Sequence, residues 1–190
     1  MMLRTFIAIE TPDFIRNAAL EIQGELRKFN CRVSWTAASS LHLTLKFLGD
    51  TPDSESALIA DALSEVAQRF PPLELGLSRT GVFGGGKPRV LWLGITAIPT
   101  LNALQKAVEG ACAKLGFPPE GRDYHPHLTL GRVKEPEGTS EMVENLKNIK
   151  LPEIRFSAEE LVFFKSELFP SGAVHTPLNK FRFSGKTIEL

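Results

Sequence analysis

Residues 41–49 read LHLTLKFLG and residues 126–132 read PHLTLGR, so the motif His-Leu-Thr-Leu occurs twice, 85 residues apart. Side chains of a β-strand point alternately to its two faces. In each copy, the histidine and the threonine therefore share one face and the two leucines share the other. We expect the leucines in the core, which directs the histidine and threonine of each copy to a more accessible face.

The whole chain is predicted to be an internal repeat. The shift of 85 residues that superposes the motifs also aligns residues 6–9 with 91–94, and residues 73–80 with 158–165. Several blocks at one offset indicate duplication of a structural unit. We therefore predict a single bilobal domain over residues 1–190, with a first repeat over about residues 1–85 and a second over about residues 86–190.

Each half is expected to follow the plan strand, helix, strand, helix, strand. In the first half, apolar periodicity and turn residues place these elements at about residues 5–10, 12–29, 40–48, 58–66 and 73–78. In the second half they fall at about residues 90–95, 101–115, 127–133, 140–149 and 154–165. Thr11 and Thr100 are the expected N-caps of the first helix in each half. The glycine-rich residues 81–88 are interpreted as the hinge or crossover between the halves.

This order of elements predicts an α+β fold. We expect two similar lobes, each of antiparallel sheet plus helices, related by a pseudo-twofold axis. The active-site cleft is predicted between the lobes, where equivalent residues of the two halves would face one another.

Composition restricts the possible partners and compartment. The 190 residues carry 22 basic and 22 acidic side chains, so the formal net charge is zero. Proteins that coat long nucleic acids usually carry a basic excess, so any nucleic-acid role here should involve a short segment or an end. Cys31 and Cys112 form no CxxC pair, and the sequence has no signal-peptide pattern or apolar run of membrane-spanning length. We expect a cytoplasmic protein with reduced cysteines.

Two histidines and two hydroxyls suit phosphodiester cleavage by general acid–base catalysis. One imidazole can accept a proton from an attacking water while the other donates a proton to the departing oxygen, because the ordinary pKa of histidine lies near neutral pH. The hydroxyls of Thr44 and Thr129 can donate hydrogen bonds to phosphate oxygens. The predicted catalytic residues are therefore His42, His127, Thr44 and Thr129, and this chemistry requires no metal.

Two other functions compete with this interpretation. His125 and His127, with Asp123 nearby, have a spacing that can chelate a transition metal, so a metal-dependent phosphohydrolase is an alternative, with His42 as a further ligand. The second alternative is a non-catalytic module that binds a nucleoside monophosphate in the same cleft. The sequence leaves both open.

The motifs also carry a family resemblance. The opening RTFIAI at residues 4–9, together with residues 41–49 and 126–132, resembles the two-histidine phosphoesterases, and among these most closely the bacterial and archaeal RNA 2′,3′-cyclic phosphodiesterases, also called 2′–5′ RNA ligases. The resemblance covers essentially the whole chain. It implies hydrolysis of a terminal 2′,3′-cyclic phosphate to a 2′-phosphate, and the reverse joining of ends through a 2′–5′ bond without ATP. The absence of a GxxxxGK[ST] phosphate-binding loop agrees with this.

The resemblance implies further roles and partners. It gives Arg132 a contact with the substrate phosphate, although strict alternation would put Arg132 on the leucine face. By analogy, His42 would be the acid and His127 the base. His175 stands where the family commonly has tyrosine, and we expect it to be an ordinary loop histidine. The implied partners are RNA 3′ ends with a 2′,3′-cyclic phosphate, in tRNA halves or short oligonucleotides, with no cofactor, no membrane and a monomeric enzyme.

Overall fold

The computed structural model describes residues 1–170 and 172–186. Its helices are α1 (Asp13–Arg27), α2 (Ser56–Ala67), α3 (Pro99–Lys114) and α4 (Ser140–Asn148), with short 3-10 helices η1 (Ala38–Ser40) and η2 (Asp53–Glu55). Its strands are β1 (Met2–Glu10), β2 (Val33–Trp35), β3 (His42–Pro52), β4 (Leu73–Phe83), β5 (Val90–Ile95), β6 (His127–Val133), β7 (Arg155–Ala158), β8 (Glu160–Phe169) and β9 (Gly172–Arg182).

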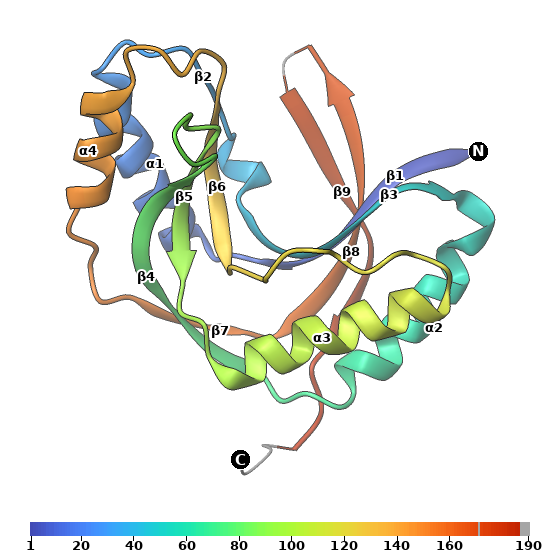
Figure 1. The fold of residues 1–190 in the computed structure, drawn as a ribbon. Helices are drawn as coiled ribbons and strands as arrows, with labels where there is room; N and C mark the ends of the chain where they lie inside the picture. The colour runs from blue at the N-terminus through green and yellow to red at the C-terminus, as the bar shows by residue number, and fades with distance from the viewer. Residues whose placement is uncertain (171, 187–190) are drawn as a thin grey trace.

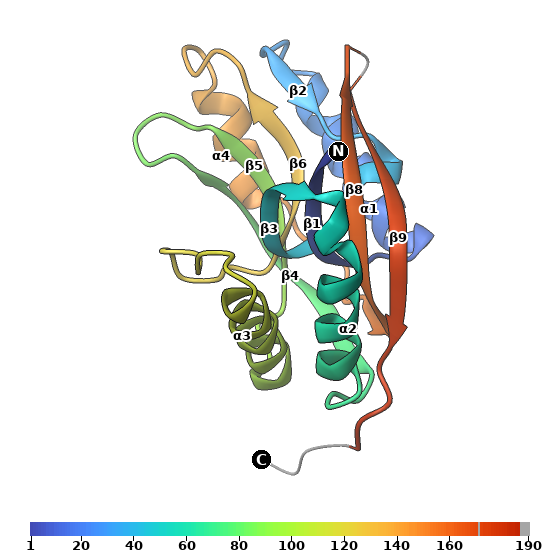
Figure 2. The ribbon, with the colours of Figure 1, turned by 90° about the vertical axis from the view of Figure 1, so that its right-hand side faces the viewer.

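The strands form two antiparallel sheets, as Figure 1 shows. One sheet has four strands in the order β3-β1-β8-β9, and the other has five in the order β2-β6-β5-β4-β7. Helices α1 and α4 lie against each other beside the five-stranded sheet, and α2 and α3 lie side by side next to the four-stranded sheet (Figures 1 and 2). The predicted α+β class with two antiparallel sheets is confirmed.

The sheets do not follow the boundary between the two sequence repeats. The order β3-β1-β8 in one sheet corresponds to β6-β5-β4 in the other. Strand β4 belongs to the first half of the sequence but pairs with β5, and β8 belongs to the second half but pairs with β1. The first half thus contributes β4 to the sheet that holds the second motif, and the second half contributes β8 to the sheet that holds the first motif. The repeat boundary near residue 85 stays a prediction about the sequence, and neither sheet is built from one half alone.

Exchange of strands explains an error in the predicted elements. The single strand expected at residues 154–165 is wrong, because the chain breaks at Glu159 into β7 and β8. Strand β7 pairs with β4 at the edge of the five-stranded sheet, whereas β8 pairs with β1 in the other sheet. A strand that changes sheets must interrupt its ladder, and apolar pattern alone does not mark that point. Strands β2 and β9 were also not predicted.

The common offset of 85 residues holds for the motif strands but not for their neighbours. Glu10 pairs with His42, and Gly94 pairs with His127 in the corresponding position of the other sheet. Strands β1 and β5 are therefore equivalent at an offset of one residue less than the predicted 85. The exchanged strands β4 and β8 are equivalent at an offset of four residues less. The difference arises because the connecting loops of the halves differ in length.

The glycine-rich segment is a hairpin turn and not a crossover. Strands β4 and β5 pair directly, and the amide of Arg89 donates a hydrogen bond to the carbonyl oxygen of Phe83 at 2.8 Å. Gly84 and Gly85 have φ angles of 121° and 60°. Both values lie in a region that glycine enters without steric cost. The predicted hinge at residues 81–88 is wrong, since β4 continues to Phe83.

Neither predicted N-cap is formed. Helix α1 begins at Asp13, and the hydroxyl of Thr11 donates a hydrogen bond to the carbonyl oxygen of Leu41 at 2.9 Å instead. Helix α3 begins at Pro99, which places Thr100 inside the helix. Proline fixes a φ angle suited to the first turn of a helix and needs no hydrogen-bond acceptor there. The strand expected at about residues 40–48 also runs further than predicted, because β3 ends at Pro52.

The core lies between the sheets and the helices and is built from buried aliphatic and aromatic side chains. The motif leucines Leu43, Leu45, Leu128 and Leu130 are all buried in it, as predicted. A smaller buried cluster, formed by Phe6, Ala8, Val162 and Phe164, lies on the other side of the four-stranded sheet. Within the described residues, no helix is long and apolar enough to cross a membrane.

Candidate active site

The histidine and threonine of each motif share the more accessible face of their strand. His42 and Thr44 in β3 are partly exposed, and so are His127 and Thr129 in β6. The leucines between them are buried. The alternation predicted from the sequence therefore holds in both motif strands.

A β-bulge at Leu130 brings Arg132 to the histidine face. Thr129 pairs with Trp92 of β5, but the next partner of β5, Leu91, pairs with Gly131, so Leu130 is an extra residue in β6. An extra residue shifts the alternation beyond it by one position. Arg132 pairs with Val90, two residues from Trp92, and directly paired residues share a face. Arg132 therefore lies on the same face as His127, although strict alternation would have put it on the leucine face.

The first motif carries an equivalent bulge at Leu45. Thr44 pairs with Ala8 and Lys46 pairs with Ile7, which leaves Leu45 extra in β3. The shift turns Lys46 to the core, where it is buried, and brings Phe47 to the histidine face with 59% of its surface exposed. Phe47 is thus the counterpart of Arg132 in the other sheet, a correspondence that no sequence pattern indicated.

His42 lies on the small apolar cluster of the four-stranded sheet. Its ring stacks on Phe6 at a centroid distance of 4.7 Å, and Phe6 in turn stacks on Phe164 at 5.0 Å. His175 of β9 meets the His42 ring edge-on at 5.1 Å. The prediction of an ordinary loop histidine at His175 is wrong. The pairing of β8 with β1 places β9 near the first motif, and no local sequence signal specifies that pairing.

His127 also packs against aromatic rings. Phe83 of β4 meets it edge-on at 4.9 Å, and Trp92 of β5 lies at 6.5 Å. Gly81 pairs with Trp92, and a Cβ atom at Gly81 would come within 2.3 Å of the indole ring. Glycine is therefore required where the indole crosses β4, and this close approach helps to form the apolar surroundings of His127.

One hydrogen bond defines the proton arrangement on His127. Its Nδ1 lies 2.6 Å from the carbonyl oxygen of His125. Because a carbonyl oxygen only accepts, Nδ1 must carry the hydrogen, and in the neutral ring Nε2 is then the free acceptor. His125 lies before the start of β6, so the two histidines do not share one strand. Among residues 1–170 and 172–186, no three His, Cys, Asp or Glu side chains are grouped to hold a metal ion.

Both motif histidines are held toward the neutral form. Burial, and next the nearby His175, lower the pKa of His42 to about 3, against an opposing hydrogen bond to the backbone at Ser40. Burial also lowers the pKa of His127, opposed by the carbonyl of His125 and assisted by the positive charge of Arg132. Burial disfavours the charged imidazolium because it is removed from water, and a neighbouring positive charge disfavours it by repulsion. These effects favour imidazoles that can accept a proton.

The strands that carry the two motifs are joined directly. Strands β3 and β6 contact each other, and the Tyr124 hydroxyl donates a hydrogen bond to the carbonyl oxygen of Thr44 at 3.3 Å. Lys46 donates hydrogen bonds to the Glu109 carboxylate at 2.7 Å and to the carbonyl oxygen of Pro118 at 2.8 Å. The segment that leads into the second motif is therefore fastened to the strand of the first.

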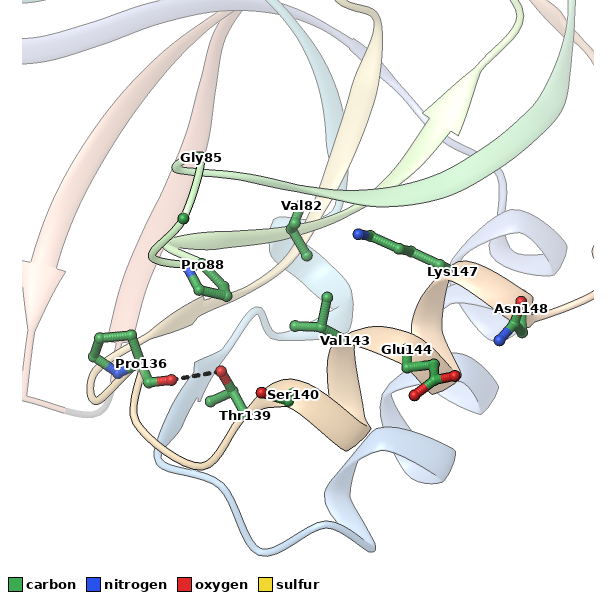
Figure 3. Close-up of a pocket in the computed structure, with 11 residues that line it drawn as sticks. Val82, Gly85, Pro88, Pro136, Thr139, Ser140, Val143, Glu144, Lys147 and Asn148 are labelled. Atoms are coloured by element: carbon green, nitrogen blue, oxygen red, sulfur yellow. Dashed lines mark hydrogen bonds between the residues drawn. The ribbon is translucent and has the colours of Figure 1, made fainter.

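A surface hollow of about 520 Å³ lies elsewhere, between the β4–β5 hairpin and α4 (Figure 3). Val82 and Pro88 line it on one side, and Val143 and Lys147 of α4 line it on the other. None of the motif histidines or threonines lines this hollow. It contributes no group to the predicted acid–base chemistry.

Comparison with known proteins gives the family. The family model of the 2′-5′ RNA ligase superfamily matches residues 16–168. The chain belongs to this superfamily. The match spans both motif strands and the helices between them, so the resemblance inferred from the two motifs is confirmed.

One curated relative and two solved structures match over nearly the whole chain. The RNA 2′,3′-cyclic phosphodiesterase of Methanothermobacter thermautotrophicus is 33% identical over 96% of this chain and 100% of its own length. The crystal structure of TT0787 of Thermus thermophilus has a TM-score of 0.82, at 28% identity over 97% of this chain and 100% of that one. Escherichia coli LigT in complex with 3′-AMP has a TM-score of 0.74, at 26% identity over 97% of this chain and 99% of that one.

Proposed function

We propose that this enzyme hydrolyses a terminal 2′,3′-cyclic phosphate of RNA to a 2′-phosphate, with the two motif histidines as general acid and base. The observation that carries the proposal is the duplicated arrangement of His42 with Thr44 and His127 with Thr129 on the accessible faces of two adjoining strands. Relatives named RNA 2′,3′-cyclic phosphodiesterase, which match over nearly the full chain, support the enzyme class and the substrate.

In the proposed mechanism, His127 is the base. Its Nδ1 donates a hydrogen bond to the carbonyl oxygen of His125, so Nε2 is available to accept a proton from water. As the water oxygen bonds to phosphorus, the bond from phosphorus to the 3′-oxygen breaks. The positive charge of Arg132 disfavours protonation of His127 in the free enzyme and so keeps the base ready.

His42 is the proposed acid. It donates a proton to the departing 3′-oxygen, which leaves the phosphate on the 2′-oxygen. Because burial lowers the pKa of His42 in the free enzyme, the proton must be gained when substrate binds. The negative charge of the cyclic phosphate favours that step, since a nearby anion raises the pKa of an imidazole.

The remaining polar groups are proposed to hold the phosphate in a cleft shared by both lobes. The hydroxyls of Thr44 and Thr129 would donate hydrogen bonds to its non-bridging oxygens, and Arg132, which shares the face of His127, would supply positive charge. We propose RNA ends in tRNA halves or short oligonucleotides as substrates, a cytoplasmic monomer as the active form, and 2′–5′ ligation as the reverse of the same step.

The deciding experiment is product analysis on a short RNA with a 2′,3′-cyclic end. A 2′-phosphate product, a bell-shaped dependence of kcat/KM on pH, and losses of about 100-fold or more in His42→Ala and His127→Ala are expected. Wild-type turnover in both variants would refute the mechanism. Binding of a nucleoside monophosphate without any turnover would identify a binding module, and loss of activity in EDTA with recovery on added metal would identify a metal-dependent enzyme.

A further inference from the structure

Gln23 of α1 is a buried polar side chain that joins two separate backbone segments. It is 2% exposed, and its amide nitrogen donates hydrogen bonds to the carbonyl oxygens of Thr36 and Leu130, each at 2.8 Å. Both partners can only accept, so both amide hydrogens are used. The backbone amide of Thr36 donates a further hydrogen bond to the carbonyl oxygen of Leu130 at 3.0 Å.

Leu130 is the bulge residue of the second motif. This explains why its carbonyl oxygen accepts hydrogen bonds from Gln23 and Thr36 and not from β5. An extra residue in one strand has no directly paired residue in the other. A buried carbonyl without a donor would destabilise the fold, so the bulge depends on another source of hydrogen bonds. Gln23 and Thr36 are that source.

The same arrangement recurs at the first motif in a weaker form. Gln105 of α3 donates a hydrogen bond to the carbonyl oxygen of Leu45, the bulge residue of β3, at 3.5 Å. In each case a glutamine from the helix of one half reaches the bulge of the other half. The recurrence indicates that the glutamine and the bulge form one structural unit.

We infer that Gln23 is a positioning residue for Arg132: its carboxamide holds the bulge at Leu130, and the bulge turns Arg132 to the face of His127 and Thr129. Without the bulge, unbroken alternation would send Arg132 toward the buried leucines. A guanidinium is strongly disfavoured there, so the strand would have to change its register and move His127 relative to Arg132. The positioning of Arg132 by Gln23 is independent of the proposed function. Only the identity of the substrate phosphate that Arg132 would bind rests on the proposed function.

The test begins with a titration that does not depend on turnover. We would follow the imidazole resonances by NMR in the wild type, Gln23→Met and Arg132→Met, with His127 assigned through its loss in His127→Gln. Arg132→Met should raise the pKa of His127, because a positive charge is removed. Gln23→Met should raise it too, and Gln105→Met, the matched change at the other bulge, should leave it unchanged.

Turnover of the short cyclic-phosphate RNA gives a second readout. Arg132→Met is expected to raise KM about 10- to 100-fold, the range for losing hydrogen bonds from a charged group. Gln23→Met should raise KM by a part of that, about three- to tenfold. In the Arg132→Met background, Gln23→Met should add no further change, because its effect passes through Arg132.

Three results would overturn the inference. These are an unchanged His127 pKa in Arg132→Met, an unchanged His127 pKa in Gln23→Met, and multiplicative effects on KM in the double variant. If Gln23→Met does not fold, Gln23→Asn replaces it, because its shorter amide cannot reach both carbonyls. If the wild type does not hydrolyse the RNA, the proposed function fails, and the titration still decides whether Gln23 positions Arg132.

Discussion

The hydroxyl of Tyr124 donates a hydrogen bond to the carbonyl oxygen of Thr44 at 3.3 Å, which fastens the segment before the second motif to the strand of the first. Tyr124 lies only three residues before His127 in the sequence, whereas Thr44 is 80 residues away from Tyr124. The relative position of the two motifs therefore depends on contacts of this kind, between segments that the sequence keeps far apart.

Tyr124→Phe removes this bond while keeping the ring. We expect a loss of about 1 kcal/mol in the free energy of unfolding, measured by urea denaturation, because the Thr44 carbonyl loses a donor. We also expect a lower kcat on the cyclic-phosphate RNA. The control is Thr51→Val, which removes a buried hydroxyl pair at 2.7 Å between Thr51 and Thr5, at the far end of β3. A similar loss of kcat in Thr51→Val would show that Tyr124 acts only through stability.

The ion pair between Lys46 and Glu109 should be a large stability determinant. Lys46→Met leaves the Glu109 carboxylate partly buried without its cation and leaves the carbonyl of Pro118 without a donor. We expect a loss of about 3–5 kcal/mol, measured by guanidinium denaturation. The double variant Lys46→Met with Glu109→Leu should lose less than Lys46→Met alone, because no uncompensated charge remains. A double variant less stable than Lys46→Met would contradict this account.

Stability should decrease as the pH is lowered below about 6.5. Both His42 and His127 have pKa values below 6.5 in the folded protein, while the unfolded chain takes up these protons near the ordinary value. Between pH 6.5 and about 3 the unfolded state therefore binds more protons, so acid favours unfolding. Each histidine can contribute at most about 1.4 kcal/mol per pH unit. The check is a pH series of urea unfolding curves, in which His42→Gln should flatten the slope and an unchanged slope would disprove the assignment.

His175→Phe should raise the pKa of His42. The charge of His175 is the second cause that holds this pKa at about 3, after burial. Phenylalanine keeps the edge-on aromatic contact and removes the charge. NMR titration of His42 should then give a value above that of the wild type, still below 6.5 because burial remains. His125→Phe is the matched control and should leave His42 unchanged. An unaltered His42 titration in His175→Phe would show that the two rings are not coupled.

Much of the site followed from local pattern. The alternation in each motif placed two leucines in the core and His with Thr on the other face, and the structure agrees at all four leucines. Simple alternation placed Arg132 on the wrong face, because the bulge at Leu130 moves every later residue of β6 to the opposite face. That bulge is stabilised by hydrogen bonds from residues distant in the sequence, such as Gln23. His175 was missed for a related reason, since its contact with His42 requires β8 to pair with β1.

The sequence by itself determined the repeated motifs, the helical and strand periods around them and the family to which the chain belongs, because these depend on residue type and spacing alone. Tertiary structure decided which strands share a sheet, where the ladders bulge and which rings meet each histidine. Strand partners are selected by packing and hydrogen bonding across the whole chain, and no window of neighbouring residues contains that information. The exchange of β4 and β8 between the sheets is therefore visible only in the folded protein.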